Sequence, residues 1–301
     1  MPQLSLNGVR IDDGFAEAFD MAATGVVITA DTAAWARQAA VSMTGFATSV
    51  IACGCEAGID TELSPRETPD GRPGVRVLLF AFNADLCETQ LVTRVGQCVL
   101  TCPGTACFAA LDAGTPVKLG AKLRYFGDGN QIAKVVDGKR YWRVPVMDGE
   151  FVVEHEVNVA DGAVGGGNLL LMGRSRAAAR TAAEAAVKAM RRVPGVIMPF
   201  PGGIVRSGSK VGSRYKGLMA STNDAYCPTL RGAVDSALSD DVASVLEIVI
   251  DGLGFEPVQQ AMRVGLHAAC ALGPESGLVA IGAGNYGGKL GRHHFHLKDL
   301  L

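Results

Sequence analysis

Residues 205–228, VRSGSKVGSRYKGLMASTNDAYCP, gather basic, hydroxyl and amide side chains in a chain that is otherwise rich in Ala, Val and Leu. Such side chains bind anions, and the segment holds little apolar material for a core. Overlapping it, GIVRSGSK at 203–210 is close to the phosphate-loop pattern G-x-x-x-x-G-K-[ST]. Ser209 and Lys210 stand in the wrong order for that pattern and no helical period follows, so a nucleotide loop is not expected. Two interpretations stay open, a plain surface loop and a local anion-binding loop.

A second segment, AGNYGGKLG at 283–291, adds Asn285, Tyr286 and Lys289 among four glycines. Basic side chains beside bare backbone amides suit an anionic ligand. We therefore expect Lys210, Arg214 and Lys289 to bind an anionic ligand. The formal net charge of the chain is −2, so there is no overall positive field and nucleic acid is not an expected partner.

Glu247 interrupts VLEIVI at 245–250, an apolar run with the composition of a β-strand. Because side chains alternate between the faces of a strand, Glu247 shares a face with Val245 and Val249. One interpretation is an exposed carboxylate near a strand end. The other is a partly desolvated carboxyl with a raised pKa, able to donate a proton in catalysis.

The eight cysteines and five histidines do not form a recognisable metal pattern. The spacings Cys53-x-Cys55 and Cys98-x3-Cys102-x4-Cys107 fit neither zinc ribbons nor ferredoxins. In GRHHFHL at 291–297 two histidines alternate in an apparent strand without a third ligand. We therefore expect reduced, structural cysteines and no metal.

The composition is that of a globular protein of about two domains, with 301 residues, 48% hydrophobic and 19% charged. The start of the chain lacks the basic and apolar regions of a secretory signal. No apolar run approaches the roughly 20 residues of a membrane span. These features predict a cytoplasmic protein without a membrane partner.

An internal repeat relates the two halves of the chain. Residues 75–101 align without gaps with 244–270, and both carry Arg-Val-Gly at the same place, ending at Gly96 and Gly265. A glycine inside a helix costs about 1 kcal/mol relative to alanine, which indicates close packing of the helix on a sheet. In this alignment Glu247 replaces Leu78, so the carboxyl is specific to the second half.

The repeat also predicts the fold. Residues 25–59 resemble 167–204, each reading strand, capped helix, strand, so each half has the order βαββαβ of the ferredoxin-like fold. We predict an α/β (α+β) protein with two such lobes, 1–146 and 147–301, the second carrying most of the site. Alternating strands at 122–157 predict a β-meander that joins the lobes.

Eight segments together resemble the formylmethanofuran:tetrahydromethanopterin formyltransferases along essentially the whole chain: ETPDGRPGV, RVGQCVLT, PFPGGIV, SKVGS, ASTNDAYCPT, EIVIDGL, AMRVG and AGNYGGKLG. The resemblance implies transfer of a formyl group between the amine of methanofuran and N5 of tetrahydromethanopterin, without a metal or prosthetic group. It also implies a homo-oligomer. The nearly neutral, Ala- and Arg-rich chain looks more like the bacterial form of methylotrophs, a subunit of a formyltransferase/hydrolase complex.

The resemblance implies roles for particular residues. Glu247 matches the family's proposed catalytic acid in EIVIDGL, and backbone amides of the glycines in AGNYGG are expected to help stabilise the oxyanion. The loops would cradle the carboxylates of both substrates, with the candidate residues Ser209, Lys210, Ser213, Arg214, Asn223, Asp224, Tyr226, Asn285 and Lys289. A different class of function stays open, a non-catalytic holder of polyanionic cofactors within a larger formyl-hydrolysing complex.

Overall fold

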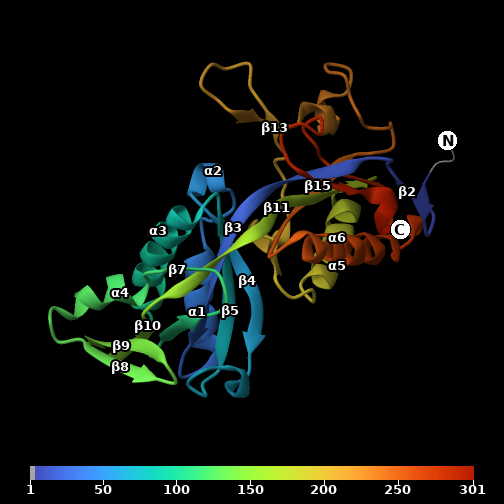
Figure 1. Cartoon of the computed structure of the whole chain (residues 1–301). Helices are drawn as coiled ribbons and strands as arrows, with labels where there is room; N and C mark the ends of the chain where they lie inside the picture. Colours follow the sequence, from blue (N-terminus) through green and yellow to red (C-terminus); the bar gives the residue numbers. More distant parts are fainter. Residues whose placement is uncertain (1–3) are drawn as a thin grey trace. The chain divides into compact units, whose positions relative to one another are not determined.

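The computed structural model describes residues 4–301, which form two compact units (Figure 1). The N-terminal unit is Met21–Ala163, and the C-terminal unit is Val164–Leu301 together with the residues up to Asp20. These limits differ from the predicted division at 146/147. The reason is that two long strands, β3 (Phe15–Thr29) and β11 (Val157–Gly173), each contribute residues to both units. A strand that continues past one core has no break in its sequence pattern.

The N-terminal unit has the predicted βαββαβ order. Its antiparallel strands lie in the order β4-β5-β3-β6, as in the ferredoxin-like fold. Its elements after β3 are α1 (Ala33–Thr44), α2 (Val50–Cys53), β4 (Glu56–Leu63), β5 (Gly74–Ala81), α3 (Ala84–Arg94) and β6 (Ala106–Ala109). The Thr32 hydroxyl caps α1 by accepting a hydrogen bond from the Trp35 amide at 3.3 Å, which explains where that helix begins.

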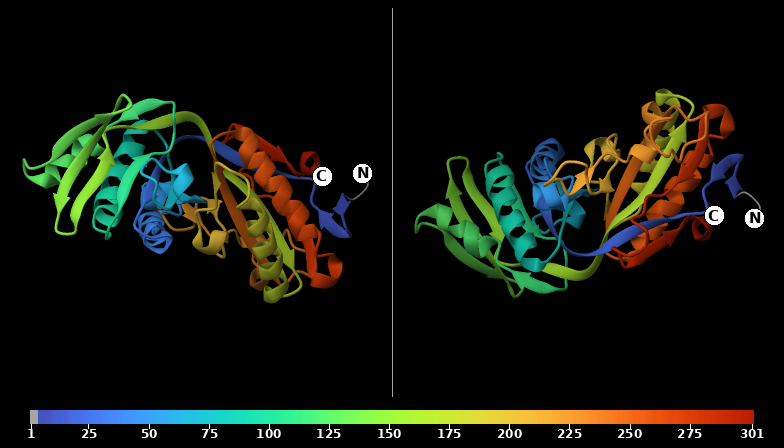
Figure 2. Two further views of the ribbon diagram at one scale, coloured as in Figure 1. Left: turned by 90° about the horizontal axis from the view of Figure 1, so that it is seen from below. Right: turned by 90° about the horizontal axis from the view of Figure 1, so that it is seen from above.

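The C-terminal unit repeats this arrangement with the strand order β12-β15-β11-β16, again antiparallel. Its elements are β11, α5 (Arg176–Met190), β12 (Val196–Ile197), β15 (Ser244–Gly252), α6 (Phe255–Cys270) and β16 (Leu278–Gly282). The helices α5 and α6 lie side by side against one face of the sheet (Figure 2). The predicted fold class, two ferredoxin-like lobes related by a repeat, is confirmed.

The first and last strands of the chain complete the C-terminal unit. They are β1 (Ser5–Leu6), β2 (Val9–Ile11) and β17 (His293–His296). The strand β2 runs parallel to β16, and β17 pairs with the first residues of β3. The 3-10 turn Leu297–Leu300 then buries Leu297 and Leu300 in the core.

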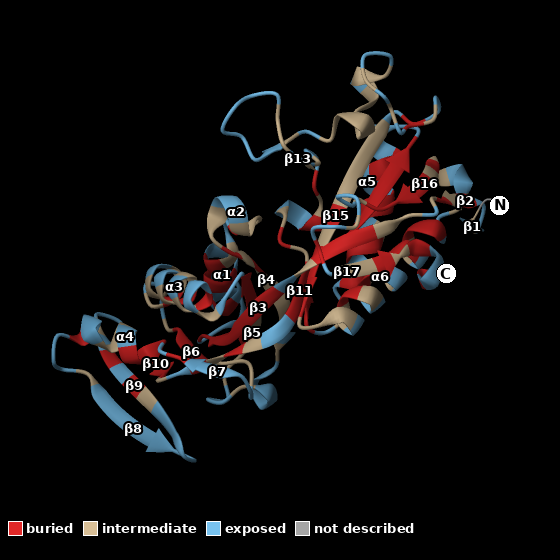
Figure 3. Cartoon of the chain, turned by 45° about the horizontal axis from the view of Figure 1, so that its top comes forward, coloured by how far each residue is buried: buried red, intermediate tan, exposed pale blue. Residues whose placement is uncertain are grey.

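The predicted meander is present as three strands, β8 (Ile132–Val136), β9 (Lys139–Val146) and β10 (Gly149–Glu154). The strand β9 pairs antiparallel with both β8 and β10. The strand β10 runs parallel to β6 and so extends the N-terminal sheet. The preceding segment, predicted as strand, is helical instead, with α4 (Gly120–Leu123) and the 3-10 turn Arg124–Gly127 following β7 (Thr115–Val117). Every residue of β8 is exposed (Figure 3).

The largest difference between the units lies in one hairpin connection. Residues 64–73 join β4 to β5, whereas residues 198–243 join β12 to β15. We call residues 198–243 the insertion. It contains the short hairpin β13 (Lys210–Val211) and β14 (Ala220–Ser221), three 3-10 turns and much exposed backbone (Figure 3). The basic segment noted in the sequence is therefore part of a connection that only one unit has enlarged.

The glycines of the repeated Arg-Val-Gly motif do not approach a sheet, so that prediction is wrong. A Cβ at Gly265 would collide with Met190 of α5, so the close packing there is between two helices. Gly96 lies in the π-helical turn Val95–Val99 near Leu123. Close helix–sheet packing occurs instead at Gly173 on β11, where a Cβ would lie 2.6 Å from the backbone nitrogen of Ala179.

This difference predicts unequal effects of alanine. We expect Gly173→Ala to lower the free energy of unfolding by about 2 kcal/mol, because the new methyl group meets helix backbone that cannot yield locally. Gly265→Ala should cost less than about 1 kcal/mol, because Met190 is flexible and the substitution gains about 1 kcal/mol of helix propensity. Urea unfolding of both variants checks this. Equal losses, or a larger loss at Gly265, would contradict the packing argument.

Candidate functional site

Glu247 lies in the middle of β15, on the face of the sheet that is turned away from α5 and α6. Its neighbours Ile248 and Ile250 point to the other face and are fully buried in the helix-covered core. Opposite Glu247 on β11 is Leu170. On the other side, the Glu247 amide and carbonyl exchange hydrogen bonds of 3.0 and 2.7 Å with Val205 of the insertion. The alternation predicted for VLEIVI is confirmed, and the backbone of Glu247 is held from both sides.

The surroundings of the Glu247 carboxyl are apolar. On its face of the sheet, Leu170, Met172 and Val245 pack with Tyr226, Leu238 and Val242, which the insertion contributes. Burial raises the pKa of Glu247 to about 7. Within residues 4–301 its carboxyl makes no hydrogen bond or ion pair. It can therefore be protonated near neutral pH and is free to donate to a ligand.

Asn168 connects this face to the glycine-rich segment 283–291, which we call the glycine loop. Its side chain accepts a hydrogen bond of 2.6 Å from the Gly284 amide and donates one of 3.0 Å to the Gly284 carbonyl. Asn168 is paired with Val249 on β15, so it lies on the same face as Glu247. The glycine loop therefore starts from the sheet surface that bears the candidate acid.

The backbone amides of the glycines in AGNYGG are already engaged within the protein. Gly284 donates to Asn168, Gly287 donates to Asn285, and Gly288 donates to Glu17. The expectation that the AGNYGG amides stabilise an oxyanion is therefore wrong, because the loop closes on polar side chains of the chain itself. The sequence pattern contains no signal for Glu17, one of two acidic residues within FAEAFD.

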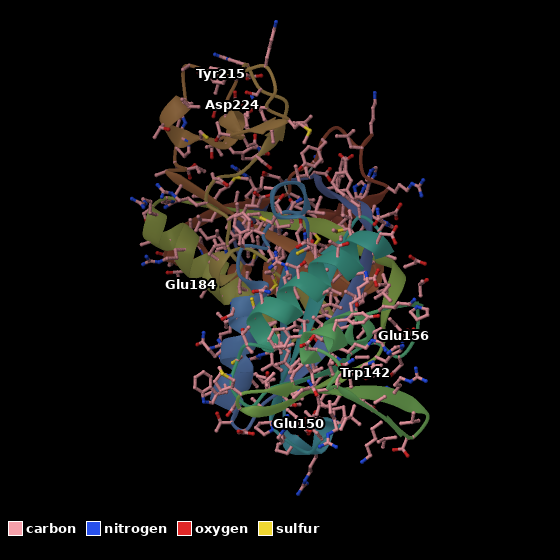
Figure 4. The ribbon with its side chains drawn as sticks, turned by 90° about the vertical axis from the view of Figure 1, so that its left-hand side faces the viewer. Trp142, Glu150, Glu156, Glu184, Tyr215 and Asp224 are labelled. Atoms are coloured by element: carbon pink, nitrogen blue, oxygen red, sulfur yellow. The ribbon has the colours of Figure 1, made fainter. Side chains whose placement is uncertain are left out.

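Lys210 and Asp224, both candidate binding residues, form an ion pair with each other. The Lys210 Nζ lies 2.7 Å from both carboxylate oxygens of Asp224, and this contact lowers the pKa of Asp224. The pair joins β13 to the 3-10 turn Asp224–Tyr226, so it braces the insertion. Figure 4 shows Asp224 and Tyr215 in the insertion, away from Glu184 on α5. If Lys210 binds a substrate anion, it does so while it also forms the ion pair with Asp224.

The other candidate residues fall into two groups. In the insertion, Ser209 and Arg214 are exposed, and the Ser213 hydroxyl accepts a hydrogen bond from the Tyr215 amide. Asn223 lies at the start of the 3-10 turn Asp224–Tyr226. Burial raises the pKa of Tyr226 at the end of that turn. Asn285 and Lys289 are exposed on the glycine loop. Of all these, Tyr226 packs on the sheet face of Glu247, and Arg214 lies in the exposed hairpin beyond β13.

A cavity of about 550 Å³ lies beside the backbone partner of Glu247. It is lined by Phe200, Pro201, Ile204, Val205, Arg206 and Ser207. The PFPGGIV segment thus supplies an apolar wall that ends at a basic and a hydroxyl side chain, a combination typical of ligand sites. Neither this cavity nor one of about 670 Å³ in the N-terminal unit is lined by a predicted site residue. We place the candidate site at the cavity next to β15 because Val205, which lines it, exchanges backbone hydrogen bonds with Glu247.

The described part of the chain contains no group of three or more His, Cys, Asp or Glu side chains arranged to hold a metal ion. His294 and His296 instead pack against the ring of Phe15, with ring centroids 4.8 and 5.2 Å apart. Among the helices of residues 4–301, none is long and apolar enough to span a bilayer.

The fold and the site define a protein of two ferredoxin-like units, one of them enlarged by a polar insertion beside a protonatable carboxyl. Residues 4–146 match the family model for formylmethanofuran-tetrahydromethanopterin formyltransferase, and residues 149–300 match the model for its proximal lobe. The chain belongs to this formyltransferase family, as its sequence motifs predicted.

Several relatives are similar over their full length. A subunit of the formyltransferase/hydrolase complex of Methylorubrum extorquens is 61% identical, covering 100% of this chain and 98% of that protein. The formyltransferase of Methylobacillus flagellatus is 59% identical, covering 98% and 99%. Among solved structures, the Methylorubrum extorquens complex with methylofuran contains a chain with a TM-score of 0.97 at 61% identity, covering 99% of both chains. The Methanosarcina barkeri formyltransferase has a TM-score of 0.93 at 45% identity, covering 99% and 100%.

Proposed function

We propose that this chain transfers a formyl group between the amine of methanofuran and N5 of tetrahydromethanopterin, with Glu247 as the acid. The observation that carries the proposal is the Glu247 carboxyl, which burial keeps protonatable near pH 7 on a sheet face that it shares with the apolar side chains of Leu170 and Val245. Family membership supports the reaction, since several relatives carry the formyltransferase name. The experiment that tests it is a formyl-exchange assay on the purified chain alone.

The chemistry needs a group that stabilises negative charge on oxygen. The attacking nitrogen forms a bond to the formyl carbon while the carbonyl electron pair moves to oxygen. Collapse of this tetrahedral intermediate breaks the bond to the first nitrogen, which takes up the proton that the attacking nitrogen releases. Protonated Glu247 passes its proton to this oxygen as the negative charge develops and takes it back when the carbonyl re-forms, and stabilisation of this kind lowers the barrier by about 3 kcal/mol. The amides of Gly284, Gly287 and Gly288 take no part, since they are engaged within the protein.

Substrate carboxylates would bind to the polar loops around this site. We assign this role to Lys210, Arg214 and Lys289, with hydroxyl, amide and phenol groups of Ser209, Ser213, Asn223, Tyr226 and Asn285 completing the contacts. Asp224 holds Lys210 in place through their ion pair instead of meeting an anionic substrate directly. No step requires a metal or prosthetic group.

Lys210→Ala tests the binding role of the insertion. We expect KM for the anionic substrate to rise several-fold and to become less sensitive to salt, with kcat little changed, because a screened charge contact is lost. Lys188→Ala, which removes a lysine of α5, is the matched control and should leave KM unchanged. Steady-state kinetics at two salt concentrations measure both. If Lys210→Ala behaves like Lys188→Ala, the ion pair with Asp224 is purely structural.

A second candidate function is a non-catalytic holder of anionic C1 carriers within a larger complex. It is favoured by the name of one relative, a subunit of a formyltransferase/hydrolase complex. This alternative requires the polar loops but not Glu247. Formyl exchange by the purified chain would exclude it, and exchange only after addition of partner subunits would favour it. In either case we propose a cytoplasmic homo-oligomer that associates with other subunits of such a complex.

A further inference from the structure

Glu17 is a fully hydrogen-bonded carboxylate outside the proposed reaction site. It lies in β3, is 1% exposed, and belongs to the C-terminal unit. One of its oxygens accepts hydrogen bonds from the amides of Tyr286 and Gly288, at 2.7 and 2.8 Å. The other accepts from Leu290 and Gly291, both at 2.7 Å. Four converging amides are the arrangement with which backbone loops bind anions.

The carboxylate is held in its charged form. Burial of Glu17 raises its pKa, but the amides of Gly291, Tyr286, Gly288 and Leu290 together outweigh burial and lower the pKa to about 2. The backbone that carries this carboxylate is also fixed. The Glu17 amide donates a hydrogen bond of 3.2 Å to the Gly284 carbonyl, and Glu17 lies opposite His294 in the pairing of β3 with β17. The charge and its location are therefore both set before any ligand binds.

The glycine loop depends on this charge for its shape. Between Gly282, where β16 ends, and His293, where β17 begins, the chain has no helix or strand of its own. Gly287 and Gly288 have φ angles of 88° and 71°, a region that only glycine adopts freely. Such a segment has many accessible conformations in the absence of an anchor. Glu17 and Asn168 supply the anchors, one at each end of the loop.

We propose that Glu17 is a positioning residue for substrate binding, an internal anion around which the glycine loop is folded so that Asn285 and Lys289 face the ligand. The inference rests on the proposed function in taking these two side chains as binding residues. Glu17 touches no substrate in this scheme. It acts by removing, in advance, the entropy cost of ordering the loop when a substrate binds.

The decisive substitution is Glu17→Gln. A glutamine has the same shape, but its amide nitrogen would face two backbone donors in place of a carboxylate oxygen, so half of the anchoring is lost. We expect the Kd for methanofuran or for tetrahydromethanopterin, measured by calorimetry, to rise tenfold or more. We expect kcat at saturating substrate to stay within about threefold. Hydrogen exchange should accelerate in peptides covering 283–291 but not in those covering α5 or β15.

Two further variants keep the test decisive. Glu17→Asp retains the charge, and its shorter side chain should give an intermediate Kd in a folded protein even if Glu17→Gln does not fold. Glu184→Gln on α5 is the control and should leave Kd and loop exchange unchanged. Unchanged Kd values for both substrates in Glu17→Gln and Glu17→Asp, or exchange accelerated equally in α5 and β15, would overturn the proposal. Because Kd is measured without turnover, this result is independent of whether the purified chain transfers formyl groups.

Discussion

Replacing Glu247 with Gln is expected to lower kcat by about 100-fold or more and to leave substrate affinity nearly unchanged. Glutamine keeps the shape of the side chain and can donate a hydrogen bond, but it cannot pass on a proton, and general acid catalysis contributes on this scale. The affinity should hold because the interaction belongs to the transition state rather than to the bound substrate. Steady-state formyl-exchange kinetics measure both quantities.

Two companion variants separate the possible roles of Glu247. Glu247→Leu removes the donor, and it matches the apolar surroundings of Leu170 and Val245. If Gln retains much of the rate while Leu loses it, Glu247 acts only as a hydrogen-bond donor. If both stay near the wild-type rate, Glu247 is a solvated strand residue and the cofactor-holder function is favoured. Glu184→Gln on α5 controls for the loss of one carboxylate elsewhere in the unit.

The second large effect is expected in the pH dependence. Burial raises the pKa of Glu247 to about 7, and the proposed acid is active only when protonated. The rate should therefore be constant below pH 7 and then fall, approaching tenfold for each further pH unit. Glu247→Gln should abolish this falling limb. A wild-type rate that is flat from pH 6 to pH 9 would remove Glu247 from the mechanism.

The titration of Glu247 should also make the free energy of unfolding depend on pH, in a direction that its pKa shift determines. The folded-state pKa of Glu247 lies above its ordinary value of 4.5. Its contribution to stability is thus fully present below about pH 4.5 and is lost as the pH rises through about 7. The effect of Glu17 on stability has the opposite pH dependence, since the pKa of Glu17 is lowered to about 2. Its contribution is present above about pH 4.5 and is lost as the pH falls toward 2. Thermal unfolding of the wild type and of Glu247→Gln across this pH range separates the contribution of Glu247, which the variant loses, from that of Glu17, which it keeps.

The sequence predicted those features that repeat or that break a repeat. The βαββαβ order of each half followed from matching segments, and Glu247 was found because it replaces Leu78 in an otherwise apolar strand. The pairing of Lys210 with Asp224 was not predicted, because a contact between residues 14 positions apart in an irregular loop leaves no periodic signal. Glu17 was missed for the same reason, as its partners lie about 270 residues away.

The predicted division at residues 146/147 agrees with the limits of the two family models but differs from the limits of the two compact units, for a related reason. Hydrophobic alternation identifies a strand, but it does not say with which core each end of a long strand packs. Both β3 and β11 continue from one core to the other, and the turn at Met147, which marks the predicted limit, merely joins β9 to β10.

The pairing of β2 with β16 has a consequence for how the protein is made. Ala280 and Ile281 of β16 pair with Arg10 and Ile11, so β2 can meet this partner only after the whole segment between the two strands has been synthesised. The N-terminal unit, Met21–Ala163, contains its own strands and helices and can close during translation. The C-terminal unit cannot complete its sheet until β16 has been synthesised, and contacts of such sequence separation form slowly. Nascent chains stalled before β16 should thus contain one folded unit and a free N-terminal segment.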